Sequence, residues 1–216
     1  MKITVKPEVF KKFPQLKVAV VRAEGIDNKS KAAKANHLLA EMQKVILLTF
    51  NQDTVKTHHL ISPWETAKQE FGKKAKHYNT SVELLLQKAL RKQKLQTKDT
   101  ITALLRYLAL KHIVPFGADD PAKLQGDIGF EVKKDDISYR DAKKILGKKL
   151  DYWKNAKTAL KPGSTSALLH FEFLPPVSPT KQKEVIDEAV GMIKAFCGGK
   201  TKIIILSKKN NSVLLK

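Results

Sequence analysis

Apolar and polar residues follow two different periods along the chain, and the two periods predict two kinds of element. Two-residue alternation or a short apolar run predicts strands at Ile3–Val5, Leu16–Arg22, Asp127–Val132, Ser166–Phe173 and Lys202–Leu206, the second and last of them buried. Steps of three and four residues predict helices over Lys31–Val55, Ser62–Phe71, the stretch between Thr80 and Arg91, Thr100–Ile113 and Pro179–Phe196. The sequence therefore predicts an α+β fold with mixed sheets packed with helices, because the helical blocks are too unevenly spaced for a regular doubly wound sheet.

The ends of the helices in the middle of the chain are marked by residues with known end preferences. A serine–proline pair at Ser62 can start the first of these helices, and Gly72 can end it in a left-handed conformation. Thr80 and Glu83 have the spacing of a capping box, in which side chain and backbone bond reciprocally. Pro115 ends the last helix of the group, since proline cannot continue a helix.

Three further stretches are interpreted from their turn residues and their charge. Gly117–Pro121 is predicted to be a turn, and the chain from Lys208 onward is expected to be partly mobile. Ile137–Leu160 is interpreted as one or two helices with a basic outer face, formed by Lys143, Lys144, Lys148, Lys149, Lys154 and Lys157. A charge run that only contacts solvent is the alternative for these lysines.

The charge of the chain is its strongest compositional feature. The 41 Lys and Arg residues exceed the 21 Asp and Glu residues, which gives a formal net charge of +20 at pH 7. Such a surface attracts polyanions, because each phosphate that it neutralises releases counterions. Lysine outnumbers arginine, which favours contacts with a phosphate backbone over bidentate reading of bases. RNA or another polyanion is the expected partner, and a generally basic surface without a specific partner is the alternative.

Other features of the sequence exclude several classes of protein. The 216 residues include 1 Cys, so no internal disulfide can form and no cysteine-based zinc site is expected. No apolar run approaches the roughly 18 residues that a membrane span requires, and no signal peptide is recognisable. The chain also lacks a P-loop, a dinucleotide-binding fingerprint, a metalloprotease helix and a nucleophile elbow. We therefore expect a cytoplasmic protein without membrane association, metal or cofactor.

Candidate chemistry lies on the strand Ser166–Phe173. By the two-residue period, Leu169 and Phe171 fall on one face of this strand, whereas His170 and Glu172 fall on the other. Two polar side chains at this spacing can present a hydrogen-bonding edge to an amine or hydroxyl group of a ligand. A strand face that merely contacts water is the alternative.

Short motifs follow one another in a defined order along the chain. They are Ser62-Pro63-Trp64, Phe71-Gly72, Tyr78 before Thr80-Ser81, a leucine-rich helix, an apolar helix and Pro115-x-Gly117. This order resembles the B3/B4 domain, which is the editing module of the beta subunit of bacterial phenylalanyl-tRNA synthetase and also occurs as a stand-alone protein. The resemblance covers most of the chain and is weakest between Glu131 and Leu160. It implies one B3/B4-like domain over residues 1–216, with an editing-domain fold, a helical subregion at about residues 30–115 and a strand-rich remainder.

The resemblance also implies roles for individual residues. Glu172 matches the glutamate that lines the editing pocket of the family, and His170 beside it is the second catalytic candidate. The implied substrate-binding residues are Ser166, Tyr107, Gly117 and Asp119. Ser166 stands where the family has an asparagine, and the loop 117–121 lacks the histidine of the synthetases. Tyr152–Thr158 replaces a polar, tryptophan-containing stretch of the stand-alone members.

The activity that the resemblance implies is hydrolysis of the ester between a wrong amino acid and the 3′ end of tRNA, not ligation of an amino acid to tRNA. Basic residues would hold the tRNA backbone, and the candidates are Lys73, Lys74, Lys76, Arg91, Lys92, Lys94, Lys154 and Lys157. Three functions remain open at this point. The first is a stand-alone B3/B4 protein that binds tRNA and hydrolyses mischarged aminoacyl-tRNA in trans. The second is a non-catalytic RNA-binding module, and the third is a protein that binds a free amino acid or another small molecule.

Overall fold

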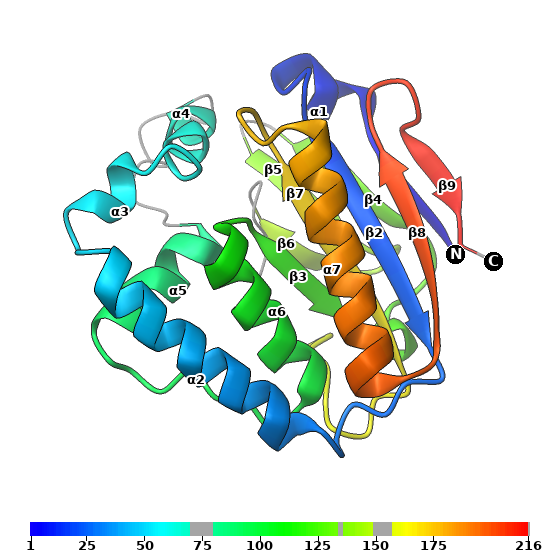
Figure 1. Ribbon diagram of the computed structural model, residues 1–216. Coiled ribbons are helices and arrows are strands. Elements are labelled where there is room, and N and C mark those ends of the chain that lie inside the picture. Colours follow the sequence, from blue (N-terminus) through cyan, green and yellow to red (C-terminus); the bar gives the residue numbers. More distant parts are fainter. Residues whose placement is uncertain (70–79, 134–135, 149–156, 216) are drawn as a thin grey trace.

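The chain folds into a layer of helices, a four-stranded sheet and a five-stranded sheet (Figure 1). A computed structural model describes residues 1–69, 80–133, 136–148 and 157–215. The four-stranded sheet is the middle layer, because one of its faces packs against helices and the other contributes to a core shared with the five-stranded sheet. The predicted α+β class, with mixed sheets packed against helices, is confirmed.

The two sheets differ in the direction of their strands. The four-stranded sheet has the order β3-β7-β2-β8, and all of its neighbours are antiparallel. The five-stranded sheet has the order β6-β5-β4-β1-β9 and is mixed, because β1 runs parallel to β4. The strands are β1 (Lys2–Val5), β2 (Lys17–Glu24), β3 (Phe116–Asp119), β4 (Ile128–Lys133), β5 (Asp136–Arg140), β6 (Ile145–Lys148), β7 (Ser166–Phe173), β8 (Lys200–Leu206) and β9 (Ser212–Leu214).

Most helices begin where the sequence predicted, but the helix predicted over Lys31–Val55 ends at Thr49, and a separate short helix follows at Thr54–Thr57. Thr80 accepts a hydrogen bond from the amide of Glu83, and the Glu83 carboxylate accepts one from the amide of Thr80, which confirms the capping box. The end predicted at Gly72 lies outside the described residues. The helices are α1 (Pro7–Lys12), α2 (Ala32–Thr49), α3 (Thr54–Thr57), α4 (Ser62–Gln69), α5 (Ser81–Leu90), α6 (Thr100–His112) and α7 (Pro179–Cys197), and Pro121–Lys123 forms a 3₁₀ helix.

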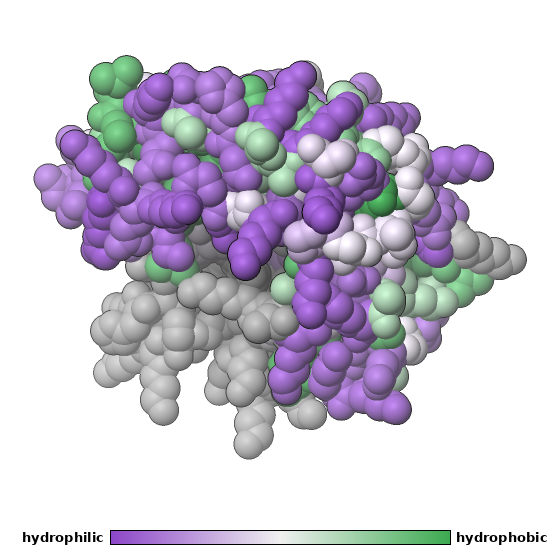
Figure 2. Space-filling view, turned by 90° about the horizontal axis from the view of Figure 1, so that it is seen from below, coloured by the Kyte–Doolittle hydropathy of each residue, from purple (hydrophilic) through white to green (hydrophobic). Residues whose placement is uncertain are grey.

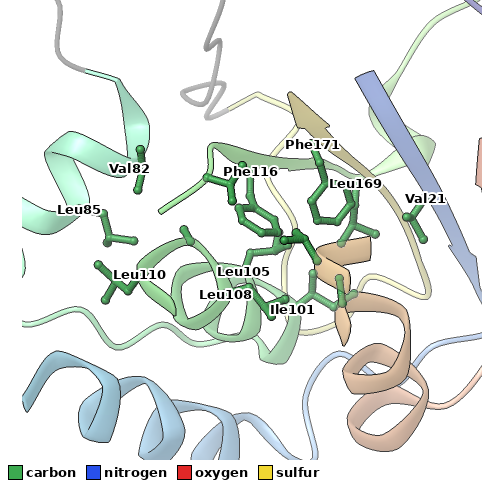
Figure 3. Close-up of a cluster of buried hydrophobic side chains, with 14 of the residues drawn as sticks. Val21, Val82, Leu85, Ile101, Leu105, Leu108, Leu110, Phe116, Leu169 and Phe171 are labelled. Carbon is green, nitrogen blue, oxygen red and sulfur yellow. The ribbon is translucent and has the colours of Figure 1, made fainter. Parts of the chain in front are cut away.

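The two faces of the middle sheet are buried against different partners. On the helix side, Phe116 of β3 and Phe171 of β7 meet edge to face, with 4.6 Å between their ring centroids (Figure 3). Residues of β2 alternate between the two sides: Val21 belongs to the core beneath the helices, whereas Val20 belongs to the core between the sheets. Burial of apolar area on both faces explains why β2 reads as a continuous apolar run.

The prediction of helices between Ile137 and Leu160 is wrong where the structure describes this region. Strands β5 and β6 are found there instead, and residues 149–156 lie outside the described part of the chain. Ile137 and Tyr139 of β5 alternate into the core between the sheets, where both are buried. Two of the lysines that suggested a helical face, Lys143 and Lys144, lie in the turn before β6, where Asp141 accepts hydrogen bonds from both of their amides.

Two smaller predictions also need correction. The segment predicted as a turn at Gly117–Pro121 begins as strand β3, which pairs with β7. Strand β8 forms as predicted but is not buried on both faces: Ile203 is 42% exposed and Ile205 is 46% exposed, because β8 is the edge of its sheet. The segment after Lys208 contains β9, which pairs with β1.

Candidate functional site

His170 and Glu172 lie on β7, between β3 and β2. They alternate with residues of the helix-side core, so their side chains enter the layer between the two sheets, as does that of Leu168. The side chain of His170 is 4% exposed and that of Glu172 is 3% exposed. The alternative of a strand face that merely contacts water is therefore wrong, because the five-stranded sheet covers this face.

The histidine and the glutamate are close to each other and to an aromatic residue of the other sheet. His170 Nδ1 lies 3.6 Å from Glu172 Oε1. The ring of Tyr139, on β5, stacks on the imidazole with 6.0 Å between the ring centroids, and Phe130 of β4 lies 4.7 Å from the Tyr139 ring. One polar pair is thus enclosed by residues from both sheets. Tyr139 was not among the predicted site residues, because the sequence pattern of this region predicted a helix.

Burial determines the protonation state of the imidazole. Removal of His170 from water holds its pKa well below the usual value of 6.5, because the charged form loses its hydration. The imidazole is therefore neutral at pH 7. A neutral imidazole has one ring nitrogen that donates a hydrogen bond and one that accepts. In this form His170 can orient a water molecule or a hydroxyl group beside the Glu172 carboxyl group.

Gly117 provides the space that the imidazole fills. Gly117 of β3 is the cross-strand neighbour of His170. A Cβ atom at position 117 would lie 1.8 Å from Nε2 of His170 and 2.2 Å from Cε1, far inside contact distance. Only glycine at this position is compatible with the observed position of the ring. The structure therefore brings together Gly117, His170 and Glu172, which the sequence analysis had named from separate segments.

A second polar group lies two residues further along β3. Asp119 faces the same side of the sheet as Gly117, is buried, and accepts a hydrogen bond from the hydroxyl group of Thr158. The adjacent Asp120 accepts a hydrogen bond of 2.7 Å from the hydroxyl group of Ser164. These bonds fix β3 to the segment before β7. Asp119 is therefore held in the wall of the site, and Thr158 is a contact that the sequence analysis missed.

The other two predicted substrate-binding residues lie away from this group. Ser166 is the first residue of β7 and pairs with Glu24 of β2. Six residues of extended strand place it about 20 Å from Glu172. Tyr107 lies on α6 and packs against the helix-side core, so the middle sheet separates it from His170. The structure does not bring either residue to the His170–Glu172 pair.

The predicted RNA-binding residues are placed only in part. Arg91, Lys92 and Lys94 are exposed in the connection between α5 and α6, and Lys157 is exposed next to Thr158. The remaining candidates lie outside the described residues, namely Lys73, Lys74, Lys76 and Lys154.

A basic group that the sequence analysis did not name lies at the end of the middle sheet that carries Glu172. Lys17 pairs with Phe173, the residue after Glu172. Lys208 and Lys209 follow the end of β8, where Leu206 pairs with Val18, the β2 partner of Glu172. With Lys11 of the adjacent α1, we define them as the site-end lysines: Lys11, Lys17, Lys208 and Lys209.

The described residues contain no group of three or more His, Cys, Asp or Glu side chains that could hold a metal ion. No helix in the described part of the chain is long and apolar enough to cross a membrane. No protein-family model matches the chain, and no curated protein gives a significant match. An assignment of function therefore depends on the ordered motifs and on the geometry of the site.

Acidification from about pH 7 to about pH 5.5 is expected to lower the free energy of unfolding, because the unfolded chain binds a proton at histidines that stay neutral in the folded state. Burial lowers the pKa of both His170 and His112, so both act in this direction below the usual value of 6.5. Each contributes up to about 1.4 kcal/mol per pH unit in that window.

Urea unfolding of the wild type and of His170→Asn at several pH values measures this effect. The variant should lose less stability than the wild type over the same acidification, while the contribution of His112 remains. An identical pH dependence of the two proteins would show that His170 is protonated as easily in the folded state as in the unfolded chain.

Proposed function

We propose that this chain is a stand-alone B3/B4-type protein that binds tRNA and hydrolyses mischarged aminoacyl-tRNA in trans. The observation that carries the proposal is the buried pair of His170 and Glu172, 3.6 Å apart, in the layer between the sheets. Glu172 is the residue that matches the pocket glutamate of the resembled family. The α+β fold with mixed sheets is compatible with such a domain.

The role of Glu172 is to bind the ammonium group of the aminoacyl moiety. A carboxylate removed from water gains from a cationic partner, because the low dielectric of the interior strengthens the attraction between the two charges. The aromatic ring of Tyr139 and the apolar residues of this core supply surface for an apolar amino-acid side chain. Entry of the aminoacyl end requires the layer between the sheets to open, because the pair is buried.

The role of His170 is to position water. Its neutral imidazole accepts a hydrogen bond from the water, whose oxygen attacks the ester carbonyl carbon to form a tetrahedral intermediate. The bond from the carbonyl carbon to the ribose oxygen then breaks, and a proton from the attacking water passes to that ribose oxygen. A strongly lowered pKa makes His170 a weak base, so orientation rather than proton abstraction is its contribution. The neighbouring ribose hydroxyl group of the substrate can assist in the same orientation.

The site-end lysines supply the contact with the tRNA backbone in this proposal. They lie near the end of β7 that carries Glu172, on the side of β2 and β8, and lysine ammonium groups bind phosphates without reading the base sequence. Arg91, Lys92 and Lys94 lie in the helix layer, so their contribution would require tRNA to extend around the side of the molecule.

The proposal is tested with a panel of mischarged tRNAs, each labelled in the amino acid, under single-turnover conditions. Release of the amino acid from at least one of them, faster than in buffer, is the expected result. Complete absence of release, together with binding of uncharged tRNA, would replace this function with a non-catalytic RNA-binding module. Absence of both release and binding would exclude tRNA both as a substrate and as a binding partner.

A second candidate function is the binding of a free amino acid. The observation that favours it is the burial of Glu172, since a closed site fits a small ligand more readily than the end of a tRNA. A ligand that binds only the folded state raises its melting temperature. A melting temperature that rises with one free amino acid, with no effect of tRNA, would support this candidate over the first.

A further inference from the structure

Seven lysines gather at the end of the molecule opposite Glu172. This end contains the turn after β2, the starts of α2 and α6, the end of α7 and the turn before β7 (Figure 1). Figure 2 views the molecule from this end and shows hydrophilic side chains over most of the described surface. We define the far-end lysines as Lys29, Lys31, Lys34, Lys98, Lys161, Lys194 and Lys200, and all of them are exposed.

Hydrogen bonds between the segments show that these lysines belong to one surface. The side chain of Asn28, next to Lys29, donates to the carbonyl group of Lys161 at 3.0 Å. The same side chain donates to Asp99, the residue after Lys98, at 3.3 Å. Segments distant in the sequence therefore meet around one asparagine, which brings the backbone at Lys29, Lys98 and Lys161 close together.

The remaining far-end lysines are tied to the same surface through α7 and β8. The ammonium group of Lys31 donates to the carbonyl group of Ala195 at 2.7 Å, and that of Lys34 lies 5.8 Å from the centroid of the Phe196 ring. Lys194 precedes these two residues on α7. Lys200 is the first residue of β8 and pairs with Glu24 at the end of β2.

The acidic groups at this end, which include Glu24, Asp27 and the α6 cap Asp99, are outnumbered by the far-end lysines. Glu24 forms an ion pair with Arg22, which is itself basic. The Asp27 carboxylate accepts hydrogen bonds from the amides of Lys29 and Ser30 at 2.9 and 3.0 Å, so it stabilises the turn, and it also attracts the charge of Lys31. Helices α2 and α6 begin here and add the positive ends of their dipoles, whereas α7 ends here and adds one negative end. The surface therefore carries a concentrated positive potential.

The side chains at this end favour a nucleic acid over a protein as partner. The large hydrophobic residues that are exposed in the described structure, such as Leu48, Ile203 and Leu214, all lie outside the segments of this end. Protein interfaces need an apolar centre rich in aromatic residues, whereas a phosphate backbone needs flexible cations. We propose that the far-end lysines form a second binding surface for RNA, which contacts phosphates and does not read the bases.

This surface is separate from the proposed catalytic site. Strand β7 runs from one to the other, and its length from Ser166 to Glu172 corresponds to about 20 Å. Binding at the far end needs neither an aminoacyl ester nor the His170–Glu172 pair. The proposal extends the proposed function, with RNA as a partner, but it does not depend on hydrolysis.

The test measures binding of an uncharged tRNA and of a plain RNA duplex over a range of salt concentrations. The test variant replaces Lys29, Lys98, Lys161 and Lys200 with glutamine. A control variant replaces Lys44, Lys56, Lys143 and Lys183 with glutamine, which are exposed elsewhere and give the same change in net charge. A third variant replaces the four site-end lysines with glutamine. Melting temperatures of all variants confirm that they are folded.

The far-end variant is expected to lose roughly tenfold or more in RNA affinity at moderate salt. The slope of log affinity against log salt concentration should become shallower by about 2–4. The control variant should stay close to the wild type. Equal losses in the far-end and control variants, or a loss confined to the site-end variant, would overturn the proposal. Binding of polyglutamate as tightly as RNA would overturn it in favour of an acidic protein partner.

The Glu172→Gln variant separates this proposal from the proposed function. It should bind uncharged tRNA and the duplex as the wild type does, because the far-end lysines are unchanged. Failure of hydrolysis with intact far-end binding would reject only the catalytic function. If mischarged tRNA is hydrolysed but the far-end variant binds RNA as tightly as the wild type does, only this surface would be rejected.

Discussion

Replacement of Gly117 by alanine is expected to lower the free energy of unfolding by about 2–3 kcal/mol, a large effect for the addition of one methyl group. The new Cβ atom would lie 1.8 Å from Nε2 of His170. The ring cannot rotate into solvent to relieve this overlap, because its side chain is 4% exposed and lies between two sheets. Either the imidazole leaves its position beside Glu172 or β3 moves away from β7, and both changes cost packing. Urea unfolding monitored by circular dichroism measures the loss.

A double-mutant cycle shows whether the loss comes from His170. The three atoms nearest to the added Cβ all belong to the His170 ring. With His170→Ala as the background, Gly117→Ala should therefore cost much less, and the coupling energy should be about 2 kcal/mol. A matched control is Gly163→Ala, since a Cβ atom at that exposed glycine meets no atom within 4 Å. Additive effects of the two substitutions would show that the ring does not fill the space above Gly117.

Local patterns in the sequence predicted most of the elements. The capping box at Thr80 and Glu83 and the proline that follows α6 affect only residues a few positions away. Such local effects can be predicted from the sequence alone. Strand β7 was predicted with its correct two faces for the same reason. The strands β5 and β6 were not, because lysines in a turn between two short strands resemble the polar face of a helix.

The candidate site could be predicted only in part because its contacts are between distant segments. The pairing of Gly117 with His170 is a matter of strand register, which no local pattern specifies. The burial of Glu172 results from the packing of a second sheet whose strands come from both ends and from the second half of the chain. The far-end lysines were missed for a similar reason, since they come from segments that are far apart in the sequence. In each case the tertiary structure decides which side chains meet.

Replacement of Glu172 by glutamine is expected to reduce the rate of single-turnover hydrolysis of mischarged tRNA by about 100-fold or more. The reason is that the substrate ammonium group loses its buried carboxylate partner, and loss of one partner of such a pair costs roughly 2–5 kcal/mol of binding free energy. Glutamine keeps the shape of glutamate but cannot hold an ammonium group with a negative charge. The free energy of unfolding should stay within about 1 kcal/mol of the wild type, because the packing is unchanged. A loss of activity with retained stability is the pattern of a residue that contacts substrate rather than one that only supports the fold.

Two comparisons make this result specific to the charge. Glu188→Gln is a matched control, because Glu188 also contacts a histidine but lies between α6 and α7 in the helix layer. It should leave the rate of hydrolysis near that of the wild type. Asp at position 172 retains the charge on a shorter side chain, so Glu172→Asp should recover part of the activity that glutamine loses. Full hydrolysis by Glu172→Gln would exclude Glu172 as the ammonium-binding group. A drop in stability of several kcal/mol, with a proportional loss of folded protein, would assign the buried pair to the fold instead of the reaction.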